Sequence, residues 1–251
     1  MEHYALAAQV YGVALVFARL GGFLMNMPGV SDRGVPVMVR LAFAFTLSLA
    51  LYPVLAPLLP PEPKELSELA AQIAIESILG LIFGLFLQLF MGGLAVAGEV
   101  ISLQTTLAFS QTVNPLEAQP STSINSFLSL IGVTLIFVTD VHQVFLAGLV
   151  RSYHMFPAGH GLPLVDLNFL MIRTFSETFT LGLQLAAPFI VFSMVYQTAL
   201  GFVAKTMPQF QIFFISTPLT VLFGLSLLAL TVGAIAGVWM DHLRDFAGQW
   251  I

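Results

Sequence analysis

The chain has 251 residues, of which 58% are hydrophobic and 8% are charged, and its formal net charge is −5. Soluble domains carry roughly 25% charged side chains, so this composition excludes a water-soluble surface and requires cover by lipid or partner subunits. The basic residues form no block, which argues against nucleic acid as a partner. The absence of Cys removes disulfides, Cys-ligated zinc and thiol nucleophiles.

Apolar segments long enough to cross a ~30 Å hydrocarbon core recur along the chain, since ~20 residues suffice. The first, residues 4–27, contains Arg19 and is longer than a signal-peptide core, so we expect it to remain as a helix. Proline, glycine and polar turns separate the segments. They predict helices over residues 4–27, 37–55, 66–104, 124–150, 169–204 and 210–238.

This pattern predicts an all-α membrane protein with about six long, partly kinked helices that form hairpins. At ~1.5 Å per residue, the segments 66–104 and 169–204 would reach about 58 Å and 54 Å, well beyond a bilayer. We expect a single membrane domain over residues 1–251. Its parts are N-terminal helices (4–104), a loop (105–123), central helices (124–204), a C-terminal hairpin arm (205–238) and an amphipathic tail (239–251).

Prolines mark the last two hydrophobic segments, with Pro188 and Pro218 inside them and Pro208 between them. Proline is tolerated in a membrane helix where neighbouring groups satisfy the freed carbonyl, which predicts a kinked and closely packed hairpin. Close helix approach is also predicted by two pairs of glycines at the spacing small-xxx-small, Gly80 with Gly84 and Gly233 with Gly237. The 8 Lys and Arg residues are scattered, so the sequence leaves the orientation in the membrane open.

Polar side chains lie inside or at the edges of the apolar segments: Arg19, Glu76, Glu99, Gln104, Asp140, His142 and Glu177. A charge at bilayer depth costs ~2.5–3.5 kcal/mol on insertion scales and tends to face protein or water. These residues could line an ion or proton path, or they could pair at interfaces with partner subunits. The second reading is favoured, because Asp140 and His142 would point about 200° apart on a helix.

The sequence predicts no catalytic residue, cofactor or metal, and the chain is interpreted as not being an enzyme. Its histidines fit none of the usual metal-ligand spacings. The stretch Gly224-Leu225-Ser226-Leu227-Leu228 lacks the second glycine of a nucleophile elbow, and no Walker-type loop is present.

Three ordered stretches of the chain resemble the FliR family of flagellar export-gate subunits. They are Ala18-Arg19-Leu20-Gly21 with the segment 28–42, Gly98-Glu99-Val100-Ile101-Ser102-Leu103-Gln104 with Asn114-Pro115, and Pro208-Gln209-Phe210 with Thr217-Pro218-Leu219-Thr220. The resemblance covers nearly the whole chain in the family's order. The chain departs from the family at Thr106, Thr112 and Asn114, where members often have Gly, Phe and Asp.

The resemblance implies a pore-forming structural subunit of the bacterial flagellar type III protein export gate, a helical multi-subunit assembly. Implied partners are two other small membrane subunits, the associated switch subunit, unfolded export substrates and membrane lipid. The implied location is the bacterial inner membrane at the flagellar basal body. The loop 105–123 would help to plug the closed pore, with Leu107, Phe109, Asn114 and Pro115 as the gate residues.

Other functions remain open at this point. A secondary transporter or ion channel for a small solute would use the proline-broken helices and the buried Glu residues, although the hydropathy shows no pair of equal halves. An intramembrane enzyme would require a nucleophile, base or metal set that the sequence does not show. The residues leave flagellar and virulence-type secretion undistinguished, with the overall pattern favouring the flagellar system.

Overall fold

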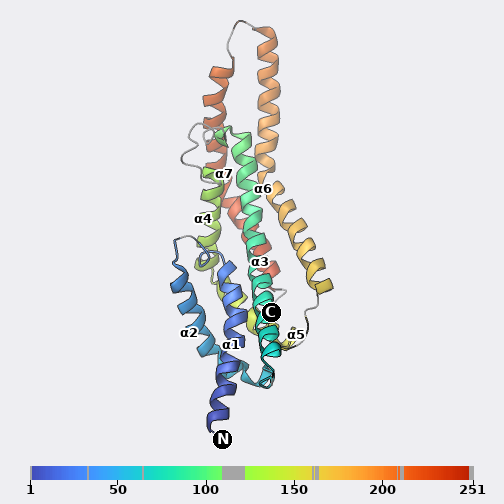
Figure 1. Ribbon diagram of the computed structural model, residues 1–251. Helices are drawn as coiled ribbons and strands as arrows, with labels where there is room; N and C mark the ends of the chain where they lie inside the picture. The colour runs from blue at the N-terminus through green and yellow to red at the C-terminus, as the bar shows by residue number, and fades with distance from the viewer. Residues whose placement is uncertain are drawn as a thin grey trace. The chain divides into compact units, whose positions relative to one another are not determined.

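The computed structural model describes residues 2–32, 34–63, 65–108, 122–159, 161, 164–207, 209 and 212–248 (Figure 1). The side chains of residues 2–6, 164, 212, 213 and 215 lie outside this description. All regular elements in these ranges are helical. In chain order they are α1 (Glu2–Asn26), α2 (Val37–Leu55), the 3-10 helix η1 (Ala56–Leu58), α3 (Leu66–Gln104), α4 (Ser123–Val138), α5 (Val141–Met155), α6 (Leu164–Thr206) and α7 (Ile212–Gly248).

The predicted class, an all-α membrane protein with long apolar helices, is confirmed. Among the described residues, 5 helices are long and apolar enough to cross a membrane, or 6 if α4 and α5 are taken together as one broken span. The bounds of α2 and α3 are those predicted from the sequence. Proline and glycine clusters flank both helices, so each helix ends where its apolar run ends.

The predicted continuous helix over residues 124–150 is wrong, because the chain breaks it at Thr139 and Asp140. Asp140 has φ 57°, a left-handed conformation that no residue inside an α-helix adopts. Asp tolerates this conformation better than most residues. The amide of Gln143 then donates to the carbonyl of Asp140 (2.9 Å) and opens α5.

The C-terminal part also differs from the prediction. The last helix continues through Gly248, so residues 239–248 extend α7 instead of forming a separate tail. Buried apolar side chains recur there every three or four residues, at Trp239, Met240, Leu243, Phe246 and Ala247. That spacing keeps one helical stripe covered and lets the helix continue.

The chain forms two compact units. Unit 1 comprises Met1–Leu89, Thr139–Thr174 and Asp245–Ile251, and unit 2 comprises Phe90–Val138 and Phe175–Arg244. The long helices α3, α6 and α7 each contribute to both units. The single membrane domain stays a prediction, since a division by contacts does not decide whether either unit folds alone.

In unit 1, α1 and α3 approach each other backbone to backbone through glycines. A Cβ atom added to Gly80 would lie 1.9 Å from the carbonyl oxygen of Arg19, and one added to Gly84 would lie 2.7 Å from that of Phe23. The spacing Gly80-xxx-Gly84 is therefore confirmed as a site of close helix approach. No described atom lies within 4 Å of such a Cβ on Gly233 or Gly237, so the role of that pair stays a prediction.

In unit 2, α3 contacts α4, α6 and α7. A Cβ on Gly98 would lie 2.5 Å from Cα of Asn125 in α4, and one on Gly182 in α6 would lie 2.6 Å from the carbonyl oxygen of Gly93. The fully buried indole of Trp239 in α7 donates from Nε1 to the carbonyl oxygen of Phe90 (3.0 Å). These contacts make the second half of α3 the centre of unit 2.

Substituting Gly80→Ala should destabilise the protein, because the new methyl group would have to displace the Arg19 carbonyl of α1. We expect a loss of about 3 kcal/mol in the free energy of unfolding, at the upper end of overpacking costs. Gly92→Ala on the same helix is the matched control, since its Cβ would meet no described atom within 4 Å. It should be neutral or stabilising by up to ~1 kcal/mol. Thermal unfolding in detergent measures both, and equal midpoints would contradict the predicted contact.

Candidate functional site at the end of α3

A buried ion pair occupies the centre of unit 1. Arg19 of α1 donates from Nε to Oε2 of Glu76 (2.5 Å) and from Nη2 to Oε1 of Glu76 (3.0 Å), and both side chains are 0% exposed. The guanidinium also donates to Oγ of Ser152 (3.0 Å) and to the carbonyl oxygen of Phe156 (2.9 Å). Its Cζ lies 3.8 Å from the ring centroid of Tyr153.

This arrangement uses most of the N–H donors of the guanidinium and both oxygens of the carboxylate. A guanidinium offers five N–H donors in a fixed fork, and the carboxylate of Glu76 matches that fork with both of its oxygens. The pair joins α1 to α3, and Ser152 and Phe156 add α5 and the residue that follows it. The chemistry of this centre is therefore structural: it fixes three helices to one another.

A second carboxylate, Glu99 of α3, binds the start of α4 in unit 2. Its Oε1 accepts hydrogen bonds from the backbone N–H of Thr122 (3.1 Å), from Oγ1 of Thr122 (3.3 Å) and from Nδ2 of Asn125 (2.9 Å). Oγ1 of Thr122 in turn accepts from the backbone N–H of Asn125 (3.3 Å), as an N-cap does. The carboxylate thus lies where the helix dipole favours negative charge.

The C-terminal end of α3 is fixed by packing. The buried side chain of Thr105 fills the space that Gly224 of α7 leaves, where a Cβ would lie 2.3 Å from Cγ2 of Thr105. Thr106 then has φ 62°, a conformation that glycine adopts without strain and that costs a β-branched residue ~1–3 kcal/mol.

Of the predicted gate residues, the structure describes Leu107 and not the other three. Leu107 is half-buried in a single helical turn after Thr106. Phe109, Asn114 and Pro115 lie outside the described residues, which stop at Ala108 and resume at Thr122. The described residues on either side of this gap are held in place, Thr105 by its contact with Gly224 and Thr122 by its hydrogen bond to Glu99.

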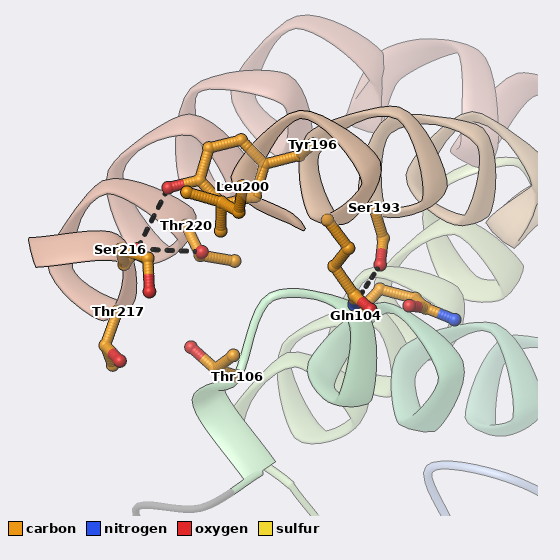
Figure 2. Close-up of a pocket in the computed structure, with 9 residues that line it drawn as sticks. Gln104, Thr106, Ser193, Tyr196, Leu200, Ser216, Thr217 and Thr220 are labelled. Carbon is orange, nitrogen blue, oxygen red and sulfur yellow. Dashed lines mark hydrogen bonds between the residues drawn. The ribbon is translucent and has the colours of Figure 1, made fainter. Parts of the chain in front are cut away.

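A pocket of about 490 Å³ opens beside the end of α3 in unit 2 (Figure 2). We call it the hydroxyl pocket, because most of its lining side chains are hydroxyls or carboxamides. It is lined by Gln104, Thr106, Ser193, Tyr196, Gln197, Leu200, Ser216, Thr217 and Thr220. The first two come from α3 and the turn after it, the next four from α6 and the last three from α7.

Hydrogen bonds hold the walls of the hydroxyl pocket in place. The phenol of Tyr196 donates to the carbonyl oxygen of Ser216 (3.1 Å) and so joins α6 to α7. Oγ1 of Thr220 donates to the same carbonyl (2.9 Å), and Nε2 of Gln197 donates to Oγ of Ser193 (2.9 Å) (Figure 2). Small polar side chains satisfied in this way leave open space that larger apolar side chains would fill.

The predicted hairpin prolines are placed in part. Pro188 lies inside α6 and Pro218 inside α7, two residues from the carbonyl that Tyr196 and Thr220 share. Pro208 lies outside the described residues.

The remaining predicted polar residues are not part of the pocket lining. The carboxylate of Asp140 is exposed and accepts from Nε2 of Gln143 (3.0 Å). His142 is half-buried in α5, and Glu177 is exposed on α6. Among the residues that the structure describes, no three His, Asp or Glu side chains form a group that could hold a metal ion.

Sequence reasoning selected polar residues within the apolar helices but did not pair them with their partners. It named Arg19, Glu76, Glu99 and Gln104, and it omitted Ser152 and the hydroxyl side chains of the pocket. The run of Ser, Tyr, Gln and Thr at positions 193, 196, 197, 216, 217 and 220 of two apolar helices was the available signal. Thr122 directly before α4 was a recognisable N-cap, but nothing in the sequence linked it to Glu99.

Comparison with known proteins adds independent information. Residues 10–246 match the family described as bacterial export proteins, family 1. The chain is 46% identical over 245 residues to the flagellar biosynthetic protein FliR of Caulobacter vibrioides, covering 98% of each chain. It is 32% identical to the FliR protein of Aquifex aeolicus, covering 92% of this chain and 89% of that one. With FliR of Escherichia coli the identity is 31%, over 90% and 85% of the two chains.

Removing one member of the buried ion pair should be severely destabilising. Glu76→Gln would leave the Arg19 guanidinium charged and uncompensated, a loss of roughly 3–5 kcal/mol in the free energy of unfolding. The double variant Arg19→Met with Glu76→Met removes both charges and should recover much of that loss. Thermal unfolding in detergent tests this, and a double variant as unstable as the sum of the single variants Arg19→Met and Glu76→Met would refute it.

The Glu99 contacts should protect the first turn of α4 from hydrogen exchange. Glu99→Ala should cost roughly 1.5–3 kcal/mol of local stability at Thr122 and the residues after it, the usual range for hydrogen bonds to a charged group. Asn125→Ala should add little once Glu99 is absent, because the two side chains share one interaction. Asp241→Asn, at an exposed carboxylate of α7, is the control. Full additivity of the Glu99 and Asn125 variants would argue against the shared contact.

Proposed function

The chain belongs to the FliR family of bacterial export proteins, and we propose that it is a pore-forming structural subunit of the flagellar type III protein export gate. Its membership of this family and its long apolar helices make it a membrane-located component of a flagellar export apparatus. The proposed activity is to help conduct unfolded proteins across the bacterial inner membrane at the flagellar basal body. No step of that activity requires bond chemistry from this chain.

The proposed partners are two other small membrane subunits of the gate, the associated switch subunit and lipid. Two helices support this, because only 17% of the apolar window of α2 and 17% of that of α7 is buried within the chain. Large side chains such as Met38, Val54, Leu222 and Leu230 are more than half exposed. Surfaces of this kind need apolar cover, which neighbouring subunits and lipid would supply.

The observation that carries the gating part of the proposal is the double anchorage of the loop 105–123. Its first residue, Thr105, is buried against Gly224, and its penultimate residue, Thr122, is bound by Glu99. A plug needs fixed ends, because an unanchored segment would pay the full conformational entropy of its chain each time it closed the pore. Leu107 and Phe109 would supply the apolar bulk of a closed constriction, and Asn114 and Pro115 would shape the segment.

A secondary transporter or ion channel for a small solute would need buried charges that are available to a moving ion. Arg19 and Glu76 instead bind each other, and Arg19 also binds Ser152 and the carbonyl of Phe156. These contacts favour the structural function over the transport of a small solute.

Deleting residues 107–112 should make the assembled gate leak ions while leaving assembly intact. The apolar bulk of the plug is lost, whereas Thr105 and Thr122 keep their contacts with Gly224 and Glu99. Single-channel conductance in planar bilayers measures the leak, and co-purification of the small apolar subunits in mild detergent checks assembly. Gly92→Ala serves as the control variant, whose gate should remain closed to ions. A deletion variant that remained at the closed conductance would show that this segment is not the plug.

A further inference from the structure

Among the described residues, the lining of the hydroxyl pocket contains no charged side chain. Tyr196 is the one ionisable residue of that described lining, and its phenol donates its proton to the carbonyl of Ser216. A charged ligand would lose its hydration in this pocket without meeting a counter-charge, which is costly. The volume of about 490 Å³ lies within the usual range for ligand-binding pockets. The pocket therefore selects an uncharged occupant.

Three of the six hydroxyl groups in the lining donate their protons to carbonyl oxygens of the protein. Tyr196 and Thr220 both donate to the carbonyl of Ser216, and Oγ1 of Thr106 donates to the carbonyl of Thr105 (2.7 Å). A hydroxyl oxygen that donates its proton still has lone pairs to accept hydrogen bonds. These walls of the pocket therefore present acceptors, so an occupant that can donate is favoured.

Two carboxamides add donors and further acceptors. Gln104 has no hydrogen-bond partner for its side chain among the described residues, and the carboxamide of Gln197 makes one described bond, to Ser193. Each amide group offers a carbonyl oxygen and an NH₂ group. The complement of such a group is another amide, which donates through N–H and accepts through C=O.

We propose that the hydroxyl pocket binds an uncharged stretch of exported polypeptide in extended form, through its backbone amides and its small apolar side chains. The proposal rests on the proposed function, in which unfolded chains pass through the assembly. Backbone binding would be independent of cargo sequence, because every residue except proline carries the same N–H and C=O groups. The carbon surfaces of Leu200, Tyr196 and the threonine methyl groups would accept small side chains.

The ester and phosphate groups of a membrane lipid fit the same pocket less well. The ester groups of a glycerolipid accept hydrogen bonds but cannot donate, so they would leave the hydroxyl oxygens of Tyr196, Thr106 and Thr220 without donors. A phosphate headgroup would bring a charge that the lining does not balance. A peptide group satisfies both needs with one planar unit.

The absence of Cys from the chain allows a direct binding test. Thr217→Cys places a thiol in the pocket lining, and Thr198→Cys places one on an exposed part of α6 outside the lining. The rate of maleimide labelling is measured on the purified gate assembly with and without N-acetyl-tetraalanine amide. We expect the peptide to slow labelling of Thr217→Cys at least fivefold and to leave Thr198→Cys unchanged. Equal rates at Thr217→Cys with and without peptide would overturn the proposal.

Two matched changes test the chemistry of recognition. Replacing the central amide of the peptide by an ester removes one donor and should weaken protection about tenfold, the equivalent of one hydrogen bond of ~1.4 kcal/mol. Gln104→Leu should weaken protection by a similar factor, while Gln88→Leu, at an exposed site of the same helix, should not. Equal protection by the ester, or protection by uncharged diacylglycerol in place of the peptide, would contradict backbone recognition.

A separate arm identifies the source of the peptide. An export substrate that carries one cysteine and is arrested in the gate by a folded fusion domain should, on addition of a copper-phenanthroline oxidant, form a disulfide with Thr217→Cys and none with Thr198→Cys. Protection by the short peptide without this cross-link would overturn the pocket as a substrate site. The leak of the 107–112 deletion reports on the proposed function independently, so the two failures are distinguishable.

Discussion

The Arg19–Glu76 ion pair is the interaction on which unit 1 depends. Two opposite charges with no exposure to solvent are tolerable only when each is paired and hydrogen-bonded. Satisfying that condition brings α1, α3 and α5 to one point, since Ser152 and the carbonyl of Phe156 complete the contacts of the guanidinium. Gly80 makes the approach possible, because any side chain there would meet the backbone of α1.

In unit 2, the polar groups between helices are satisfied by neutral hydrogen bonds and by one carboxylate, that of Glu99. Glu99 satisfies the start of α4, Trp239 satisfies a carbonyl of α3, and Tyr196 joins α6 to α7. Near the C-terminal end of α3, Thr106 adopts a conformation that costs energy. The anchored loop ends and the hydroxyl pocket are both consequences of this one neighbourhood.

The outer surfaces of the helices follow a different rule. Their exposed apolar side chains cannot be explained by packing within the chain, and they agree with a family whose named relatives are flagellar biosynthetic proteins. A subunit built in this way gains its final stability from its surroundings. Buried polar contacts fix its internal geometry, and its apolar faces are available to lipid and to neighbouring subunits.

The sequence by itself determined the class of the protein and the bounds of α2 and α3, because apolar run length and proline placement are local signals. It could not show the break at Asp140, since one residue at positive φ leaves the hydropathy unchanged. The sequence indicated Glu99 and Gln104 as polar residues of interest, but it did not indicate which residues of other helices lie beside them. Only the tertiary structure decided that Arg19 binds Glu76 and that the polar residues of α3, α6 and α7 enclose a pocket, because such pairings join positions far apart in the chain and helical periodicity carries no record of which helices meet.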